Sequence, residues 1–350
     1  MRPGEGVDFC NHKKGAMQTK ILAKHLLTTG VTAYCPTLVT SSKETYRKVL
    51  PEIHVGKSSP DGAAILGTHL EGPFINPERK GAHEEKFIRK FSSGYEDIID
   101  IYGNLDNTRI VTLAPELDHA EDGIKGLCRN HKICVSLGHS ASDLAHGEMA
   151  INCGARMITH LFNAMLPYHH RDPHLVGLLT STRVRQPVYY GIIADGVHTD
   201  PSALRIAHRA NPRGLVLVTD AIAAFGLGVG QYRLGEMEIE LKRDSVSGVL
   251  RATLLDSATL CGSVATLSQC VSNFANVIGR INLPYAIEAA TSHAADAVGL
   301  PKRGRYTPGS DADLVLLEDN SEELLVLATV TCGKFGYLRP DSFDIEMSQR

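Results

Sequence analysis

The sequence of 350 residues contains no run of eighteen apolar residues, so it predicts no membrane-spanning helix. Its first fifteen residues also lack the apolar core of a signal peptide, and we therefore expect an unexported, cytoplasmic protein. The formal net charge of -3 leaves no overall positive field to attract nucleic acid or an anionic membrane. We accordingly expect neither as a partner, and any anionic ligand must be bound by a local group of residues.

The eight cysteines form no CxxC pair, and their neighbours are mostly apolar, which is typical of reduced, buried thiols. No GxxxxGK[ST] motif occurs, which argues against a nucleotide phosphate loop. The glycines at 226–230 have the wrong spacing for a dinucleotide-binding fold. With 43% hydrophobic and 21% charged residues, the composition instead favours one large α/β domain with a substantial core.

Seven short apolar segments in the first two thirds of the chain predict buried parallel strands. These segments are 32–39, 65–70, 110–113, 133–137, 157–161, 188–194 and 215–218. Helix-like stretches separate most of them, at 18–28, 95–102, 117–130, 141–153 and 202–211. Strand and helix alternating at this spacing indicate right-handed βαβ crossovers.

Polar motifs stand at the carboxyl ends of these strands, namely HLEGPF, LAPE, LGHS, THLFNAM, ADGVH and VTDA. A TIM-like (β/α)8 barrel gathers side chains from many strand ends, whereas a doubly wound sheet concentrates them at one switch point. The pattern therefore favours the barrel. Beyond Ala221 we expect Gly-rich loops, an alternating strand at 236–241, helices near 263–278 and 285–298, and a final apolar strand at 312–317.

Glu71, His139 and His160 each stand at or near the end of a predicted strand. A carboxylate and two imidazoles at one barrel mouth form the ligand set of a catalytic zinc with an open position. Singly, a strand-end histidine is more often a hydrogen-bonded structural residue, and a glutamate often caps a helix. Their positions on three strands favour the metal. His69, on the same side of its strand as Glu71, is a weaker ligand candidate or a group that orients a ligand.

Asp220 closes the last predicted strand and is placed to take a proton from water and return it to a leaving nitrogen. The alternative is a helix N-cap, but a neighbouring metal favours catalysis. In the polar loop 163–173, Arg171 supplies a guanidinium suited to phosphate. His83 and His198 add imidazoles after neighbouring strands. Taken singly, each of these three is an ordinary solvated loop residue.

Together, HLEGPF, KGAH, LGHS, THLFNAM, HHRDP, ADGVH and VTDA resemble the N-acetylglucosamine-6-phosphate deacetylases of animals, within the amidohydrolase superfamily. The resemblance implies hydrolysis of this sugar phosphate to glucosamine 6-phosphate and acetate, with Asp220 as the acid/base. It implies one divalent metal per chain, zinc, on Glu71, His139 and His160. It also implies a homodimer, because the loop arginine of bacterial relatives reaches a neighbouring subunit. The implied substrate contacts are Ala82, His83, Asn163, Ala164, Arg171, Asp195, Gly196, Val197, His198, Leu260, Cys261 and Gly262.

Two departures from the family pattern accompany this resemblance. Relatives begin with a segment of a small β-sandwich domain and a first barrel strand, whereas Gly6 matches the stretch just after that strand. We therefore expect a barrel lacking its first strand over 6–305, a remnant of the small β domain over 306–335, and a divergent tail over 336–350. Cys261 stands where a small residue is usual. The alternatives are a truncated, impaired or non-catalytic isoform of low stability, and a related cyclic amidase or deaminase.

Overall fold

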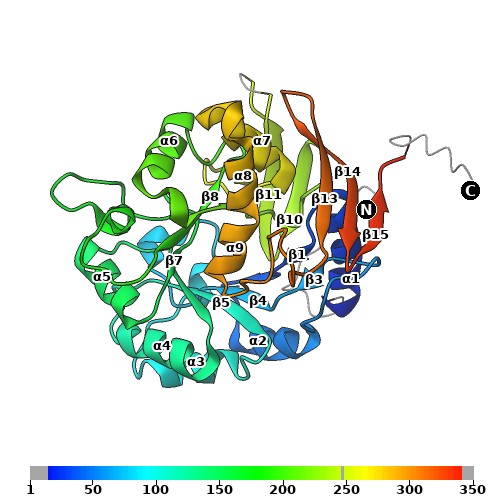
Figure 1. Cartoon of the computed structure of the whole chain (residues 1–350). Coiled ribbons are helices and arrows are strands. Elements are labelled where there is room, and N and C mark those ends of the chain that lie inside the picture. Colours follow the sequence, from blue (N-terminus) through cyan, green and yellow to red (C-terminus); the bar gives the residue numbers. More distant parts are fainter. Residues whose placement is uncertain (1–14, 246–247, 341–350) are drawn as a thin grey trace, which may run out of the picture.

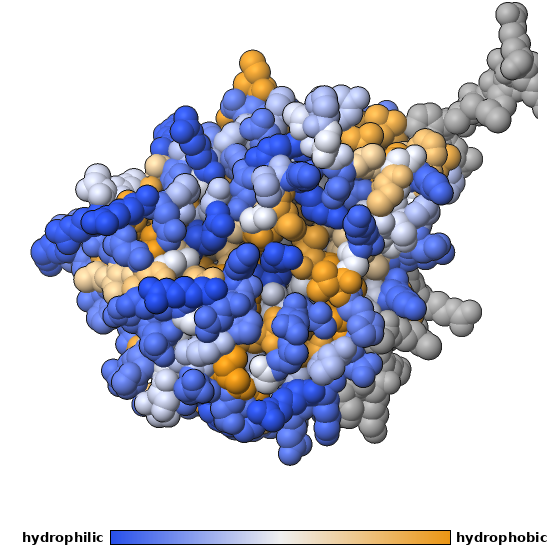
Figure 2. All heavy atoms as spheres, turned by 60° about the horizontal axis from the view of Figure 1, so that its bottom comes forward, coloured by the Kyte–Doolittle hydropathy of each residue, from blue (hydrophilic) through white to orange (hydrophobic). Residues whose placement is uncertain are grey.

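The computed structural model describes residues 15–245 and 248–340 (Figure 1). The start of the predicted barrel domain at residue 6, Cys10, and the last ten residues of the predicted tail lie outside this part of the chain. No helix in the described residues is long and apolar enough to cross a membrane. The face drawn in Figure 2 is mostly hydrophilic, with apolar residues gathered toward its middle.

A parallel sheet of seven strands forms the centre of the fold, in the order β2-β4-β5-β6-β7-β8-β9. Each predicted strand segment overlaps one of them. Their bounds are β2 (Thr37–Val39), β4 (Thr68–Glu71), β5 (Thr108–Leu113), β6 (Cys134–Leu137), β7 (Met157–Ile158), β8 (Tyr189–Ile193) and β9 (Leu215–Val218). A short parallel pair, β1 (Ala33–Tyr34) and β3 (Ala64–Ile65), precedes β2 and β4. The strand order follows the sequence, as in a TIM-like α/β barrel.

Nine helices occur in the described residues (Figure 1). They are α1 (Gly15–Thr28), α2 (Lys43–Val49), α3 (Tyr95–Tyr102), α4 (Ala120–Gly126), α5 (Leu144–Cys153), α6 (Pro201–Ala210), α7 (Leu267–Ile278), α8 (Leu283–Ala290) and α9 (Ser292–Ala297). Three of them, α4, α5 and α7, begin later than predicted. His119, just before α4, has a left-handed φ of 59°. Asp143 is the N-cap of α5 and has extended backbone, and its side chain accepts a hydrogen bond from the N–H of His146.

The barrel core lies between the strands and these helices. Fully buried side chains from the strands, such as Leu70, Val135 and Ile192, belong to one cluster with Ile124 and Phe274 from the helices. Burial of this continuous apolar layer is the main favourable term that holds the strand ends in place. The site residues that follow the strands therefore start from a fixed frame.

A three-stranded antiparallel sheet, here called the flap, lies between β9 and α7 in the chain. It consists of β10 (Gly230–Leu234), β11 (Met237–Arg243) and β12 (Leu250–Leu254). The alternating strand expected at 236–241 is confirmed over 237–241, within β11. The flap has a small core of its own, separate from the barrel core. This flap core is made of Ala224, Ile239, Leu241, Ala252 and Cys261.

The described chain ends in a second antiparallel sheet of β13 (Leu314–Asp319), β14 (Leu324–Thr331) and β15 (Lys334–Leu338). The sequence predicted 312–317 as the final strand, which is wrong, because two more strands pair beyond it. Helix α1 packs against β14 and β15, and the Thr329 hydroxyl donates to the carbonyl of Leu27. β15 crosses the domain boundary placed at 335, and the division into domains remains a prediction.

Candidate active site

Three buried side chains from three strands converge at one point. Glu71 is the last residue of β4, and His139 and His160 stand two residues beyond β6 and β7. Their Nε2 atoms lie 3.0 and 3.1 Å from Oε1 of Glu71 and 3.1 Å from each other. All three residues are at most 6% exposed. The structure therefore brings the three predicted ligands together.

The backbone turns sharply where the two histidines stand. His139 and His160 have φ values of 51° and 27°, in the left-handed region that L-residues avoid. Such strain costs on the order of 1 to 3 kcal/mol per residue and is concentrated at functional sites. Nδ1 of His139 donates to the carbonyl of Arg79 at 2.9 Å, which directs Nε2 toward Glu71. Nδ1 of His160 is buried and has no partner among the described residues.

The charges of this group suit a divalent cation. Burial favours the neutral acid of Glu71, but hydrogen bonds from His139 and His160 outweigh it and hold its pKa well below the usual range. Burial lowers the pKa of His160, but the hydrogen bond and the charge of Glu71 have the larger, opposite effect and raise this pKa to about 9. Two imidazole nitrogens and a carboxylate oxygen thus lie within about 3 Å of one another. A divalent metal fits this donor set.

His69 lies outside the ligand group. Its Nδ1 lies 3.1 Å from the hydroxyl of Thr37, and its Nε2 lies 2.8 Å from that of Thr112. The hydroxyl of Thr112 in turn lies 2.8 Å from that of Thr159. Of the two roles that the sequence left open for His69, the structure supports a hydrogen-bonded residue beneath the ligands rather than a ligand.

Asp220 follows β9 with a left-handed φ of 48°. Its carbonyl accepts from the N–H of Ser263 at 2.8 Å, and the N–H of Ile222 donates back to the carbonyl of Ser263 at 3.1 Å. Desolvation first, and then the charge of Glu71, raise the pKa of Asp220 to about 6. Residues 223–226 form a turn and not a helix, so the N-cap alternative is wrong.

A second carboxylate–imidazole pair follows β8. Oδ1 of Asp195 accepts from the N–H groups of Val197 and His198, both at 2.9 Å, and Oδ2 accepts from Nδ1 of His198 at 2.7 Å. The His198 side chain is 6% exposed. The charge of His198 lowers the pKa of Asp220, which opposes the desolvation of that carboxyl, so the pair lies near Asp220. Both oxygens of Asp195 are therefore occupied in fixing one imidazole.

His83 lies against the ligand group. Its ring centroid is 4.4 Å from that of His139. Nδ1 lies 2.7 Å from the hydroxyl of Thr40 and accepts from its N–H at 3.4 Å, which assigns the ring proton to Nε2. Burial first, and then His139, lower the pKa of His83 to about 3. His83 is thus a neutral N–H donor beside the ligands.

Comparison with known proteins places this geometry in a family. Residues 9–336 match the amidohydrolase family. The chain is 50% identical over 336 residues to the N-acetylglucosamine-6-phosphate deacetylases of Bos taurus and Homo sapiens, covering 95% of this chain and 80% of each relative. The chain belongs to the N-acetylglucosamine-6-phosphate deacetylase family. The enzyme of Caenorhabditis elegans is 43% identical over 347 residues, which cover 97% of this chain and 80% of that relative.

Solved structures of N-acetylglucosamine-6-phosphate deacetylases share the fold. That of Thermotoga maritima superposes with a TM-score of 0.81 at 28% identity, covering 97% of this chain and 86% of that one. A mutant of the Mycobacterium smegmatis enzyme, solved in complex with N-acetyl-D-glucosamine 6-phosphate, gives a TM-score of 0.80 at 30% identity. That superposition covers 96% of this chain and 84% of the other.

Further residues implied by the family resemblance lie in the loops that follow β7 and β12. After β7, the carbonyl of Ala164 accepts from the N–H of Ser140 at 3.1 Å, and the amide of Asn163 donates to the carbonyl of Leu161 at 3.4 Å. After β12, Leu260 pairs with Thr253. Cys261 is buried in the flap core, and Gly262 has a φ of 84° beside Asp220.

Arg171 is exposed in the loop between β7 and β8. Within the described residues, its guanidinium contacts only Nε2 of His170, at 3.2 Å, and no contact joins it to the ligand group. The structure therefore leaves this predicted phosphate-binding side chain apart from the three ligands of its own chain.

Glu116 is a site residue that sequence reasoning did not single out. Its Oε1 accepts from the side chain of Asn76 at 3.0 Å and from the N–H of Ala141 at 2.7 Å, and Oε2 accepts from Ser140 at 2.7 Å. One carboxylate thus ties together the loops that follow β4, β5 and β6. The available signal was its place at the end of β5, in the motif LAPE.

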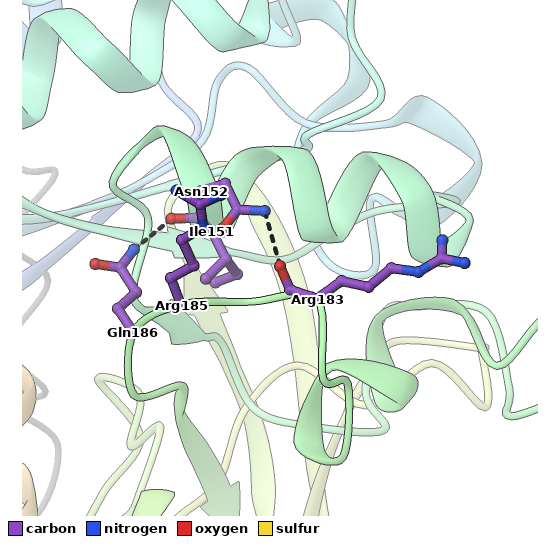
Figure 3. Close-up of a pocket in the computed structure, with 5 residues that line it drawn as sticks. All are labelled: Ile151, Asn152, Arg183, Arg185 and Gln186. Carbon is purple, nitrogen blue, oxygen red and sulfur yellow. Dashed lines mark hydrogen bonds between the residues drawn. The ribbon is translucent and has the colours of Figure 1, made fainter.

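A hollow of about 350 Å³ lies elsewhere, at the end of α5 (Figure 3). Ile151, Asn152, Arg183, Arg185 and Gln186 line it, and none of them belongs to the site described above. Gln186 donates to the carbonyl of Ile151, and Asn152 donates to that of Arg183. These bonds fasten the loop at 181–187 to the helix.

Proposed function

We propose that this chain hydrolyses N-acetylglucosamine 6-phosphate to glucosamine 6-phosphate and acetate, in the cytoplasm, with one zinc ion held by Glu71, His139 and His160. The observation that carries the proposal is the buried ligand group within electrostatic reach of Asp220, in a chain half identical to known deacetylases. A divalent ion at this site supplies a fixed positive charge that polarises the acetamide carbonyl and makes water more acidic.

Asp220 moves the proton in this proposal. Its carboxylate takes a proton from the attacking water as the oxygen bonds to the carbonyl carbon, and the protonated acid then delivers that proton to the departing nitrogen. Burial raises the pKa of the Asp220 carboxyl, which favours its protonated form and so assists delivery of the proton to the nitrogen. The main-chain bridge between Asp220 and Ser263 fixes the backbone that carries this carboxyl.

The surrounding residues hold the sugar phosphate. Nε2–H of His83 is free to donate to the substrate, and Asp195 acts by orienting His198, because both its oxygens are already occupied. Residues of the neighbouring loops complete the proposed binding surface, namely Ala82, Asn163, Ala164, Gly196, Val197, Leu260, Cys261 and Gly262. The exposed guanidinium of Arg171 pairs with the phosphate bound by a partner subunit, so the active form is a homodimer.

The test is to supply the purified chain with zinc and N-acetylglucosamine 6-phosphate and to quantify acetate and glucosamine 6-phosphate. We expect both products in equal amounts, and none from the metal-free protein. Release of ammonia, or hydrolysis of a cyclic amide in place of the sugar phosphate, would assign the site to another amidohydrolase reaction. A metal-loaded, folded chain that releases no acetate would contradict the proposal.

A further inference from the structure

A small apolar surface lies beside the site, where the flap core meets two loops. Ala82, from the loop after β4, and Ile222, from the loop after β9, both pack against the flap core. Cys261 belongs to that core and is 3% exposed, whereas Ala82 and Ile222 keep part of their surface open. We call these three side chains the wall.

One end of the wall adjoins the ligand group. Ala82 stands between Gly81 and His83. A Cβ placed on Gly81 would lie 3.6 Å from Cε1 of His139, and the His83 ring is 4.4 Å from the His139 ring. Ala82 therefore lies between two residues, Gly81 and His83, that both stand close to His139.

The other end of the wall adjoins Asp220. A Cβ placed on Gly262 would lie 2.6 Å from Cγ2 of Ile222 and 3.6 Å from Oδ2 of Asp220. Ile222 and the carboxylate thus face the same glycine. Burial, and then the charge of Asp220, raise the pKa of the Cys261 thiol to about 12, so this thiol is a neutral, apolar group near the carboxylate.

We infer that the wall of Ala82, Ile222 and Cys261 packs against the acyl carbon of the substrate and restricts the acyl group to acetyl. This inference rests on the proposed deacetylase function. In that reaction the carbonyl carbon lies between the ligand group and Asp220, and its oxygen and nitrogen are taken up by polar partners. The remaining substituent of the carbonyl carbon is the methyl group. The wall is an apolar surface that extends from the ligand group to Asp220, on either side of this carbon.

Side chains of fixed size next to a methyl group discriminate against one more carbon. A single methylene in a hydrophobic pocket changes kcat/KM by roughly 10- to 200-fold. The wall consists of one small, one branched and one thiol side chain, each held by the flap core or by the ligand loop. An added carbon on the acyl group would therefore meet packed atoms, whereas removal of part of Ile222 would make space for it.

The first experiment widens the wall. We expect Ile222→Ala to raise the ratio of kcat/KM for N-propionyl- over N-acetylglucosamine 6-phosphate by about tenfold. Leu254→Ala is the matched control, because Leu254 is an aliphatic side chain packed on the same core from β12. It should leave the ratio unchanged. An unchanged ratio in Ile222→Ala, with acetate still released by the unaltered chain, would overturn the wall and leave the proposed function standing.

A second variant narrows the wall and guards against misfolding of the first. Ala82→Val should lower kcat/KM for the N-acetyl compound relative to the N-formyl compound by about tenfold. Calorimetric binding in the Asp220→Asn background gives a readout with little turnover, and the same order of acyl preferences is expected in the dissociation constants. Equal shifts for all acyl groups would overturn the inference. Failure of the unaltered chain to bind or cleave the N-acetyl compound would overturn the proposed function as well.

Discussion

On the ligand side of the site, Glu71, His139 and His160 are at most 6% exposed, whereas on the other side Asp220 and Ile222 keep part of their surface open. The ligands follow strands whose side chains belong to the large barrel core. The Asp220 side is covered by the flap, whose core consists of only five buried side chains. The two sides therefore differ in how much packing supports them.

This difference separates two tasks. A metal site tolerates little displacement of its ligands, and the barrel core supplies a frame that changes little with single substitutions at the surface. The flap side meets the variable part of a substrate, and its contacts are local, such as the bridge between Asp220 and Ser263. Changes on the ligand side should abolish function, while changes toward the flap should modify it by degrees.

The largest effect is expected from His139→Ala. It removes one ligand of the proposed metal and leaves Glu71 and His160 to hold the ion alone, so we expect loss of bound zinc and of all measurable turnover. Elemental analysis and acetate release check both. His131→Ala is the control, because His131 contacts Tyr95 outside the site and should keep metal and activity. Full metal content in His139→Ala would remove His139 from the ligand set.

Asp220→Asn should keep the metal but lower kcat by about a hundredfold or more, because the amide cannot accept or return the proton. Asparagine tolerates the left-handed φ of 48°, so the backbone should not change. Asp256→Asn, at an exposed position with a similar φ of 56°, is the matched control. Near-normal turnover in Asp220→Asn would mean that another group transfers the proton.

The convergence of the three proposed metal ligands could be predicted from the sequence because an apolar run fixes where a parallel strand ends. Glu71, His139 and His160 could thus be placed at one mouth from their positions alone. The contacts that orient them could not be predicted in this way. The bond from His139 to the Arg79 carbonyl joins residues 60 positions apart, and that between Thr40 and His83 spans 43. Such pairings depend on the conformations of loops, which cannot be predicted from the hydrophobic periodicity of the sequence.

The same limit explains the error near the C-terminus. The run at 312–317 is apolar and predicted a strand, and β13 forms there. β14 has buried residues on both faces at its middle, and a register shift interrupts its pairing with β13. A strand of this kind shows no clean alternation in sequence, and β15 is short and mostly exposed. Pairing with the neighbouring strands therefore identifies β14 and β15, whereas their hydrophobic pattern does not.

Arg171→Ala should reduce kcat/KM for N-acetylglucosamine 6-phosphate by about 10- to 100-fold, the usual worth of a hydrogen bond to a charged group. Unphosphorylated N-acetylglucosamine should be affected little, since it carries no dianion. Arg183→Ala removes another exposed guanidinium, at the hollow in Figure 3, and should change neither substrate. Equal losses on both substrates would show that Arg171 supports the loop.

The metal-free protein should show the cost of keeping Asp220 beside Glu71. With a folded pKa of about 6, raised above its ordinary value, Asp220 favours folding when protonated, and this contribution is lost as pH rises from about 4 to 6. Asp220→Asn carries no charge and should be more stable than the unaltered chain at pH 7, by about 1 to 3 kcal/mol, but not at pH 4. Urea unfolding at both pH values measures this, and a pH-independent difference would contradict it.

The smallest effect is expected where the flap touches the ligand side. At the turn between β10 and β11, Glu236 pairs with Lys86, which also contacts Glu84 at 2.9 Å, next to His83. The side chains of Lys86 and Glu236 are 54% and 71% exposed, so solvent screens the pair. We expect Glu236→Gln to change kcat/KM by less than about twofold at low salt and by nothing at high salt.

Glu121→Gln is the control for that variant, because it breaks a similarly exposed pair with Lys125 on α4, away from the flap. It should leave kcat/KM unchanged at every salt concentration. A salt-dependent change confined to Glu236→Gln would show that the flap position affects the site through this contact. A large loss in Glu236→Gln that persisted at high salt would mean that the flap is held as firmly as the ligand side, and the contrast between the two sides would be wrong.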